Sequence, residues 1–170
     1  VETAFIEDTE WKAKWISDGK ELPLHEEYFY KDDPMQLFSK IFKAEKEIAS
    51  TRLYITGLCY YEAFLNDEKV GDNVLSPGWI DYREQILYSV YDVTVQIEKG
   101  DNVIGATVGN GWYNLLPLRM LGAKNFREFL ATGRPRLLAQ LRIVYSDGSE
   151  DMVTTGDTWQ TLSGPVIRNS

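Results

Sequence analysis

The sequence predicts an all-β domain built as a sandwich or jelly roll. Short segments rich in β-branched and aromatic residues recur from residue 52 onward, and turn residues separate them at intervals of about 8 to 12 residues. No long stretch combines helical periodicity with both caps, so a parallel α/β sheet with crossover helices is disfavoured. We expect one β-sandwich domain over residues 36–170, preceded by an irregular lead-in over residues 1–35.

The lead-in has the least regular pattern in the chain. Trp11 and Trp15 suit either one helix face or a strand-and-turn anchor, and Pro23 and Pro34 favour an irregular segment. Residues 36–45 then alternate between two faces, neither of which is cleanly polar. This alternation predicts the first edge strand.

Five further segments have the composition of strands. In the clearest of them, residues 137–145, every odd-numbered residue is apolar, as expected for a half-buried strand. Asp147-Gly148 then favours a hairpin turn, because these residues readily adopt positive φ angles. Residues 66–69 and 98–101 are predicted as further turns. The five predicted strands are residues 53–65, 85–93, 102–108, 137–145 and 150–154.

Residues 114–134 form a long connection, with short helical turns expected around residues 124–130. Long connections in compact domains are often functional. The alternative is a surface excursion packed by its own apolar residues, Leu115, Leu118 and Phe129. The sequence leaves both interpretations open.

Composition excludes several classes of function. The net charge of −8 and the pI near 4.7 argue against a nucleic-acid partner, which requires clustered Lys and Arg. No apolar run reaches the ~18 residues of a membrane-spanning helix, and residues 1–5 lack the pattern of a signal peptide. We therefore expect no membrane partner.

The supply of metal ligands is equally restrictive. A single cysteine, Cys59, and a single histidine, His25, cannot provide a zinc or iron–sulfur ligand set. We expect no cofactor. Calcium stays compatible with the composition, because it needs only oxygen ligands.

Signatures of catalysis are missing from the sequence. There is no Gly-x-Ser-x-Gly elbow, and any nucleophile–histidine pair would have to use His25. The glycine-rich run at residues 105–111 lacks the Lys-Ser/Thr of a phosphate-binding loop. The 26 acidic residues make some close carboxyl pair inevitable, but no local pattern marks one for catalysis. We predict no catalytic residue and expect that the chain alone is not an enzyme.

Two segments, residues 70–83 and 108–114, combine glycines with aromatic and amide side chains. This is the chemistry that binds sugars, because an aromatic ring packs on the apolar C–H face of a pyranose. Asn, Asp and Arg side chains can bond to the sugar hydroxyls, and glycines let backbone groups approach closely. The segments therefore predict a carbohydrate site if they meet in space.

Each of these residues also has a purely structural interpretation. Trp79 and Trp112 suit the core equally well, with their N–H groups bonded to Asp81 or to a backbone carbonyl. Asp72 and Asn73 suit turn caps as well as calcium ligands.

At these positions the chain resembles the bacterial α-L-rhamnosidase N-terminal domain family. One departure from the family pattern is Asp67, where glycine usually follows the turn asparagine; aspartate tolerates the left-handed conformation, so we expect the turn to survive. The resemblance extends from residues 13–16 to residues 159–169, and its longest matching runs are residues 52–66, 70–72, 75–79, 81–83, 91–94, 100–105 and 109–113.

The resemblance implies a galactose-binding-domain-like jelly roll with a role in substrate recognition, and some related modules bind rhamnose with the help of calcium. The catalytic acid and base would lie in a helical (α/α)₆ barrel that follows this region. The partners implied are that barrel, other domains of the same polypeptide, and rhamnose-containing carbohydrate. A secreted or periplasmic parent enzyme would fit, but the compartment stays undecided.

By this resemblance, the positions to test are Asp72, Asn73, Trp79, Asn110, Trp112 and Tyr113. Tyr82 and Arg83, from the first segment, complete the set of candidate substrate-binding residues. The rival interpretation is a structural domain that docks on the catalytic barrel and stabilises it without binding sugar.

Overall fold

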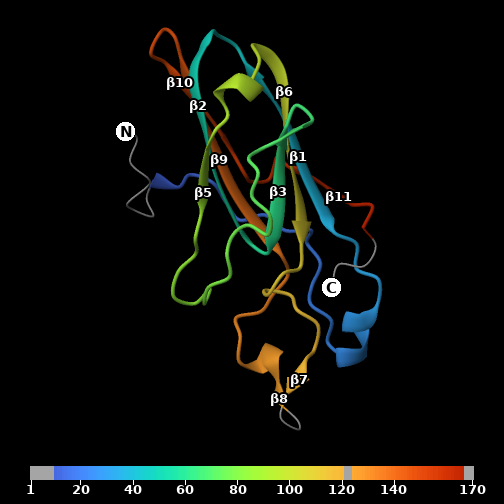
Figure 1. The fold of residues 1–170 in the computed structure, drawn as a ribbon. Helices are drawn as coiled ribbons and strands as arrows, with labels where there is room; N and C mark the ends of the chain where they lie inside the picture. Colours follow the sequence, from blue (N-terminus) through green and yellow to red (C-terminus); the bar gives the residue numbers. More distant parts are fainter. Residues whose placement is uncertain (1–9, 121–123, 167–170) are drawn as a thin grey trace.

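Two antiparallel sheets pack face to face in the computed structural model, which describes residues 10–120 and 124–166 (Figure 1). One sheet has the strand order β11-β1-β6-β3-β4 and the other β10-β9-β2-β5. The all-β sandwich prediction is confirmed. The strands are β1 (Gln36–Ala44), β2 (Ile48–Leu58), β3 (Tyr60–Leu65), β4 (Glu68–Lys69), β5 (Ser89–Asp92), β6 (Gly100–Gly109), β7 (Arg119–Met120), β8 (Lys124–Asn125), β9 (Arg136–Tyr145), β10 (Glu150–Thr154) and β11 (Gln160–Ser163).

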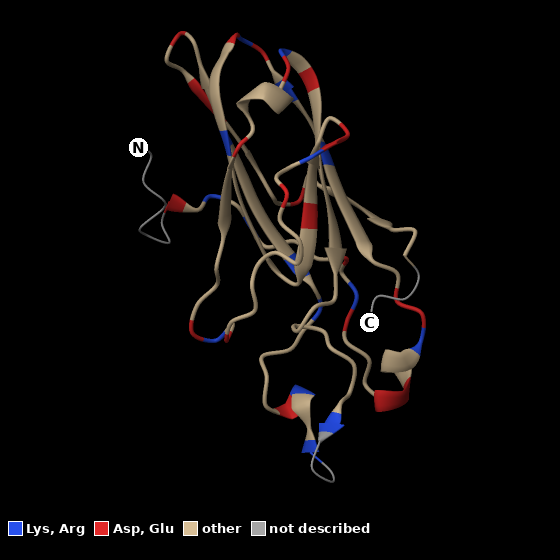
Figure 2. Ribbon diagram, in the orientation of Figure 1, with Lys and Arg blue, Asp and Glu red and all other residues tan. Residues whose placement is uncertain are grey.

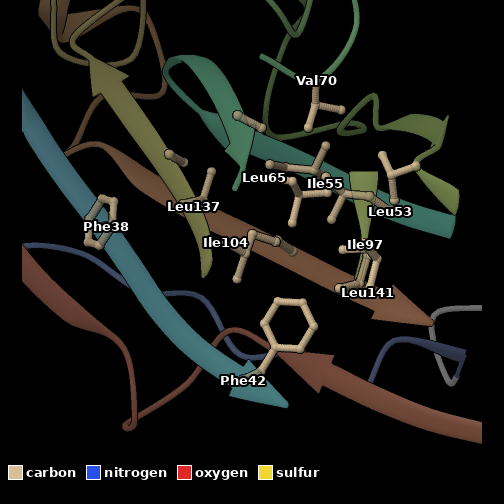
Figure 3. Packing of buried hydrophobic residues seen from close by; sticks show 14 of the residues in the cluster. Phe38, Phe42, Leu53, Ile55, Leu65, Val70, Ile97, Ile104, Leu137 and Leu141 are labelled. Atoms are coloured by element: carbon tan, nitrogen blue, oxygen red, sulfur yellow. The ribbon is translucent and has the colours of Figure 1, made fainter. Parts of the chain in front are cut away.

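The core lies between the two sheets (Figure 3). The odd-numbered residues of β9 face inward, as their alternation predicts, and meet the inward residues of β2 and β6. Apolar surface removed from water in this way supplies the main stabilisation of the fold. The labelled core residues are Phe38, Phe42, Leu53, Ile55, Leu65, Val70, Ile97, Ile104, Leu137 and Leu141.

Residues 53–65 do not form one strand. The chain leaves the four-stranded sheet at the end of β2 and enters the five-stranded sheet as β3, with the fully buried Cys59 between them. A Cβ on Gly57 would lie 2.4 Å from Cys59 Sγ. Glycine at position 57 therefore leaves space for the Cys59 side chain where the chain passes from one sheet to the other. Residues 53–58 are all buried and only β3 alternates, and the continuous run of apolar and aromatic residues hides the break between the two strands.

The expectation that residues 36–45 form an edge strand is wrong. β1 pairs with β6 along its whole length and with β11 on its other side. β11 was not predicted, because its four residues are all exposed and carry no inward–outward pattern. The edges of this sheet are β11 and β4.

The predicted turns are present, and the one at residues 98–101 has its bend at Lys99 and φ 113° at Gly100. Asn66 and Asp67 have φ angles of 48° and 68°, so the turn between β3 and β4 forms with aspartate in place of glycine. Gly148 has φ 81° in the turn between β9 and β10. The predicted strand at residues 85–93 is confirmed only over β5, and residues 85–88 lie outside it.

Over residues 10–35, the part that the structure describes, the lead-in is mostly irregular and includes the 3₁₀ helix η2 (Glu26–Tyr30). It is nevertheless fastened to the sandwich. The Lys12 amide donates to Gln140 Oε1 at 2.7 Å, and Ile16 forms a β-bridge with Leu137. Further along, the buried Arg134 guanidinium binds Asp18 and Asp33.

The connection at residues 114–134 projects from one end of the sandwich and carries the two-stranded β7–β8 hairpin (Figure 1). The helical turn expected around residues 124–130 is present as η4 (Phe126–Glu128). Basic residues gather on and beside this projection at Arg119, Lys124 and Arg127 (Figure 2). Within the described residues, no helix has the length and apolar character needed to cross a membrane.

Candidate functional site

The two glycine- and aromatic-rich segments meet in space. The ring centroids of Trp79 and Trp112 are 5.8 Å apart, with 49° between the ring planes. Tyr82 and Tyr113 form a second contact, edge to face, with centroids 5.5 Å apart. The two segments thus form one aromatic cluster at the end of the sandwich where β6 ends.

The indoles of this cluster are in contact with water. Trp79 is 52% exposed and Trp112 is 44% exposed, so neither is a core residue. Asp81 binds Arg83 through both carboxylate oxygens, with Arg83 Nε 2.9 Å from Oδ1. This ion pair lowers the pKa of Asp81 to about 2. Two adjacent exposed indoles form a surface on which an apolar face could stack.

The loop that carries Trp112 has a tightly constrained backbone. Gly111 has φ 53°, and a Cβ there would lie 3.2 Å from the Tyr60 backbone nitrogen. Asn114 donates from its amide to the Asn110 carbonyl at 3.2 Å, and from Nδ2 to Asn110 Oδ1 at 2.9 Å. These two hydrogen bonds close the turn from Asn110 to Asn114, which carries the exposed Trp112.

The opposite loop is fastened to β3 and β5. Gly71 has φ 69° and packs so closely on Tyr91 that a Cβ would lie 2.5 Å from the ring. Asn73 Nδ2 donates to the Tyr91 hydroxyl at 3.0 Å. The Tyr61 amide donates to the Ser76 carbonyl at 2.9 Å.

Asp72 and Asn73 lie exposed on this loop. Across residues 10–120 and 124–166, no group of three or more His, Cys, Asp or Glu side chains is placed to hold a metal ion. Any calcium bound at this loop would have to draw on amide and carbonyl oxygens beside the Asp72 carboxylate.

A cleft of about 900 Å³ adjoins the aromatic cluster. Of the predicted residues, it is lined by Asn110 and Trp112; the other six lie outside its lining. Its remaining walls come from the outer face of the five-stranded sheet, from the first loop, from the insertion and from the lead-in. The lining residues outside the prediction include Tyr30, Met35, Tyr60, Glu62, Val74, Leu75, Thr107, Asn114, Leu115, Leu116, Pro117 and Leu118.

The sequence pattern indicates part of this lining, although these residues were not among the predicted site residues. Tyr60 and Glu62 alternate with the inward-facing Tyr61 and Ala63, so strand periodicity alone places them on the outer face. Tyr30 had no such signal, because a long-range hydrogen bond from its hydroxyl to the Pro117 carbonyl at 3.1 Å brings it to the cleft.

The cleft combines a largely apolar lining with a few hydrogen-bonding groups. Most of its lining is aromatic or aliphatic, with Glu62, Thr107 and Asn110 as hydrogen-bonding groups. Burial raises the pKa of the neighbouring Tyr82 to about 12, so its hydroxyl stays protonated at neutral pH. Among the described residues that line the cleft, Glu62 alone carries a carboxyl group. This set of groups suits a ligand with apolar and hydroxylated faces.

Comparison with known proteins gives one consistent result. The family model of the α-L-rhamnosidase N-terminal domain matches residues 46–170. An α-L-rhamnosidase of Alteromonas sp. (strain LOR) is 36% identical over 169 residues, covering 98% of this chain and 18% of that protein.

Two solved structures are similar as well. The α-L-rhamnosidase of Dictyoglomus thermophilum superposes with a TM-score of 0.81 at 32% identity, covering 99% of this chain and 18% of that one. The α-L-rhamnosidase of Streptomyces avermitilis, complexed with L-rhamnose, gives a TM-score of 0.69 at 36% identity, covering 80% of this chain and 13% of that one. The chain thus spans less than a fifth of the length of these relatives.

Proposed function

Because the chain belongs to the α-L-rhamnosidase N-terminal domain family, we propose that it is a non-catalytic part of such an enzyme and assists recognition of rhamnose-containing glycosides. The observation that carries this proposal is the contact between Trp79 and Trp112, two half-exposed indoles from separate loops. Exposed aromatic pairs are costly to leave in water, and a sugar face would cover them.

The polar groups around the indoles support the same ligand. Asn110 lines the cleft next to Trp112, and Asp72 and Asn73 lie on the loop that leads to Trp79. Amide and carboxylate groups can bond to paired hydroxyls and so fix the orientation of a pyranose. A related structure contains L-rhamnose, which makes this sugar the first one to test.

The absence of a carboxyl pair from the cleft lining supports a non-catalytic role. Glycoside hydrolysis uses two carboxyl groups about 5 to 9.5 Å apart on either side of the scissile bond. Among the described lining residues, only Glu62 provides a carboxyl group. We expect no release of rhamnose from an aryl rhamnoside by this chain alone, and measurable release would contradict this part of the proposal.

Isothermal titration with L-rhamnose, with and without calcium, tests the recognition role. We expect weak binding, with a Kd of about 1 mM, because only a few polar groups lie beside the two indoles to bond to a sugar. Trp112→Ala and Trp79→Ala should abolish the heat, while Trp15→Ala, an exposed tryptophan outside the cluster, should leave it unchanged. No heat at millimolar rhamnose, together with unchanged parent activity for Trp112→Ala, would refute the proposal.

A second function is favoured by the aliphatic residues around the cleft. Val74 is 75% exposed, Leu75 is 61% exposed and Leu118 is 48% exposed. Contiguous exposed apolar residues mark surfaces that are covered in an assembly. The occupant would be the catalytic (α/α)₆ barrel of the same polypeptide, since relatives extend far beyond this chain.

The full-length enzyme tests the docking role. Leu75→Asp and Leu118→Asp should then lower the melting temperature of the barrel and expose new sites to limited proteolysis, with Val95→Asp as an exposed control on η3 (Thr94–Gln96). An unchanged barrel melting temperature in both variants would leave docking without support, whatever the sugar titration shows.

A further inference from the structure

The insertion at residues 114–134 is tied to the lead-in by several contacts besides the ion pairs of Arg134 with Asp18 and Asp33. Arg119 forms an ion pair with Glu26, and the Tyr30 hydroxyl donates to the Pro117 carbonyl. The Arg127 guanidinium stacks on Phe29, with its Cζ 4.1 Å from the ring centroid. Two segments far apart in the sequence thereby form one wall of the cleft.

Arg127 differs from Arg119, because its side chain turns toward the loop at residues 108–114, which carries Trp112. Its NH1 donates to Asn114 Oδ1 at 3.3 Å and also to the Leu115 carbonyl. Burial lowers the pKa of the guanidinium, although an arginine stays charged at neutral pH. A half-buried charge held by fixed acceptors and an aromatic face has little freedom to move.

Hydrogen bonds connect Arg127 through Asn114 to the loop that carries Trp112. Asn114 is only 6% exposed, and its Nδ2 donates to Asn110 Oδ1 at 2.9 Å. The side-chain amide of Asn114 is therefore shared between Arg127 on one side and Asn110 on the other. Its orientation is set by the charged donor, because the Oδ1 atom faces the guanidinium.

We propose that Arg127 is a positioning residue, which acts through Asn114 to fix the Asn110–Asn114 turn and so hold Trp112 against Trp79. Arg127 is not part of the cleft lining, so it has no direct contact to offer a ligand there. The expected effect of Arg127 on sugar affinity rests on the proposed function. Its expected effect on the geometry of the indole pair is independent of that function.

Far-ultraviolet circular dichroism measures the indole pair directly. Two indoles in oblique contact couple their electronic transitions and give a bisignate band, which Trp79→Phe or Trp112→Phe should remove. Arg127→Met keeps the aliphatic stem but removes the guanidinium, and it should reduce the band to less than half. Arg119→Met, in the same insertion, should leave the band unchanged, because its partner Glu26 is remote from the loop.

Rhamnose titration gives the second readout. Arg127→Met should weaken binding about tenfold, since a hydrogen bond from a charged donor is lost. Arg127→Lys keeps the positive charge and should therefore retain part of the circular dichroism band that Arg127→Met loses. If wild-type protein gives no heat with rhamnose and Trp112→Ala leaves the parent activity unchanged, the recognition role fails while the band still tests Arg127.

A full-strength band in folded Arg127→Met would overturn the proposal, whatever its affinity for sugar. If Arg127→Met does not fold, as judged by its thermal melt, Arg127→Lys decides. A reduced band in folded Arg127→Lys supports the positioning role, and an unchanged band overturns it.

Discussion

Asn66 and Asn102 join two turns through their side chains, with Asn66 Nδ2 donating to Asn102 Oδ1 at 2.8 Å. Asn102 is 1% exposed, and its Nδ2 donates to the carbonyls of Glu98 and Gly100. Asn66 Oδ1 in turn accepts from the Val103 amide. The turn between β3 and β4 and the turn before β6 thus hold each other in place.

Replacement of Asn102 should therefore be strongly destabilising. Asn102→Ala removes the side-chain partner of the Glu98 amide, of the Glu98 and Gly100 carbonyls and of Asn66 Nδ2, and we expect a loss of about 3 kcal/mol in the free energy of unfolding. Urea denaturation measures this loss. Asp101→Ala, at the neighbouring exposed position, serves as the control and should change the free energy by less than about 0.5 kcal/mol.

The loop at residues 70–83 contains a matched pair of glycines, Gly71 and Gly78. Gly71→Ala should cost about 2 kcal/mol of stability and weaken rhamnose binding, because φ is 69° and the new Cβ would meet Tyr91. Gly78→Ala, where a Cβ meets open space, should be close to neutral. Thermal melts and titrations of both variants check this, and equal effects would show that the left-handed backbone at Gly71 is unimportant.

The pH dependence of the aromatic cluster follows from Tyr82. Burial raises its folded pKa to about 12, above the unfolded value of about 10. The stability linked to this raised pKa is fully present below pH 10 and is lost as the pH rises through 12. Burial also raises the pKa of Tyr61 and Tyr145, so tyrosinate absorbance near 295 nm should show several late-titrating groups, of which Tyr82→Phe removes one. Titration of that group near pH 10 in the folded protein would contradict the burial of this ring.

Truncation tests the division into a lead-in and a domain over residues 36–170. That fragment should fold but lose several kcal/mol, because Arg134 would keep a buried charge without Asp18 and Asp33 (roughly 3–5 kcal/mol). Arg134→Met in the fragment should recover part of the loss.

A fragment that begins at residue 46, where the family match starts, should not fold cooperatively, since it lacks β1 from the interior of its sheet. Urea unfolding of both fragments against the 170-residue chain provides the measurement. Equal stability of the fragment over residues 36–170 and the whole chain would show that the lead-in is dispensable.

The sequence by itself determined the fold class and most of the local elements. Alternation identified β9, and turn chemistry located the hairpins at Asp67 and Gly148 and with the second of them β10, because these features depend on residues close together in the chain. It also identified the two loops whose tryptophans meet.

The tertiary structure alone decided which strands share a sheet and which side chains share a cleft. Cys59 marks a crossing between sheets that alternation cannot show, and β1 is interior only because the distant β11 pairs with it. Tyr30 and Arg127 reach the site through hydrogen bonds and stacking between segments far apart in sequence. Such contacts depend on the packing of the whole chain, and local periodicity therefore carries no record of them.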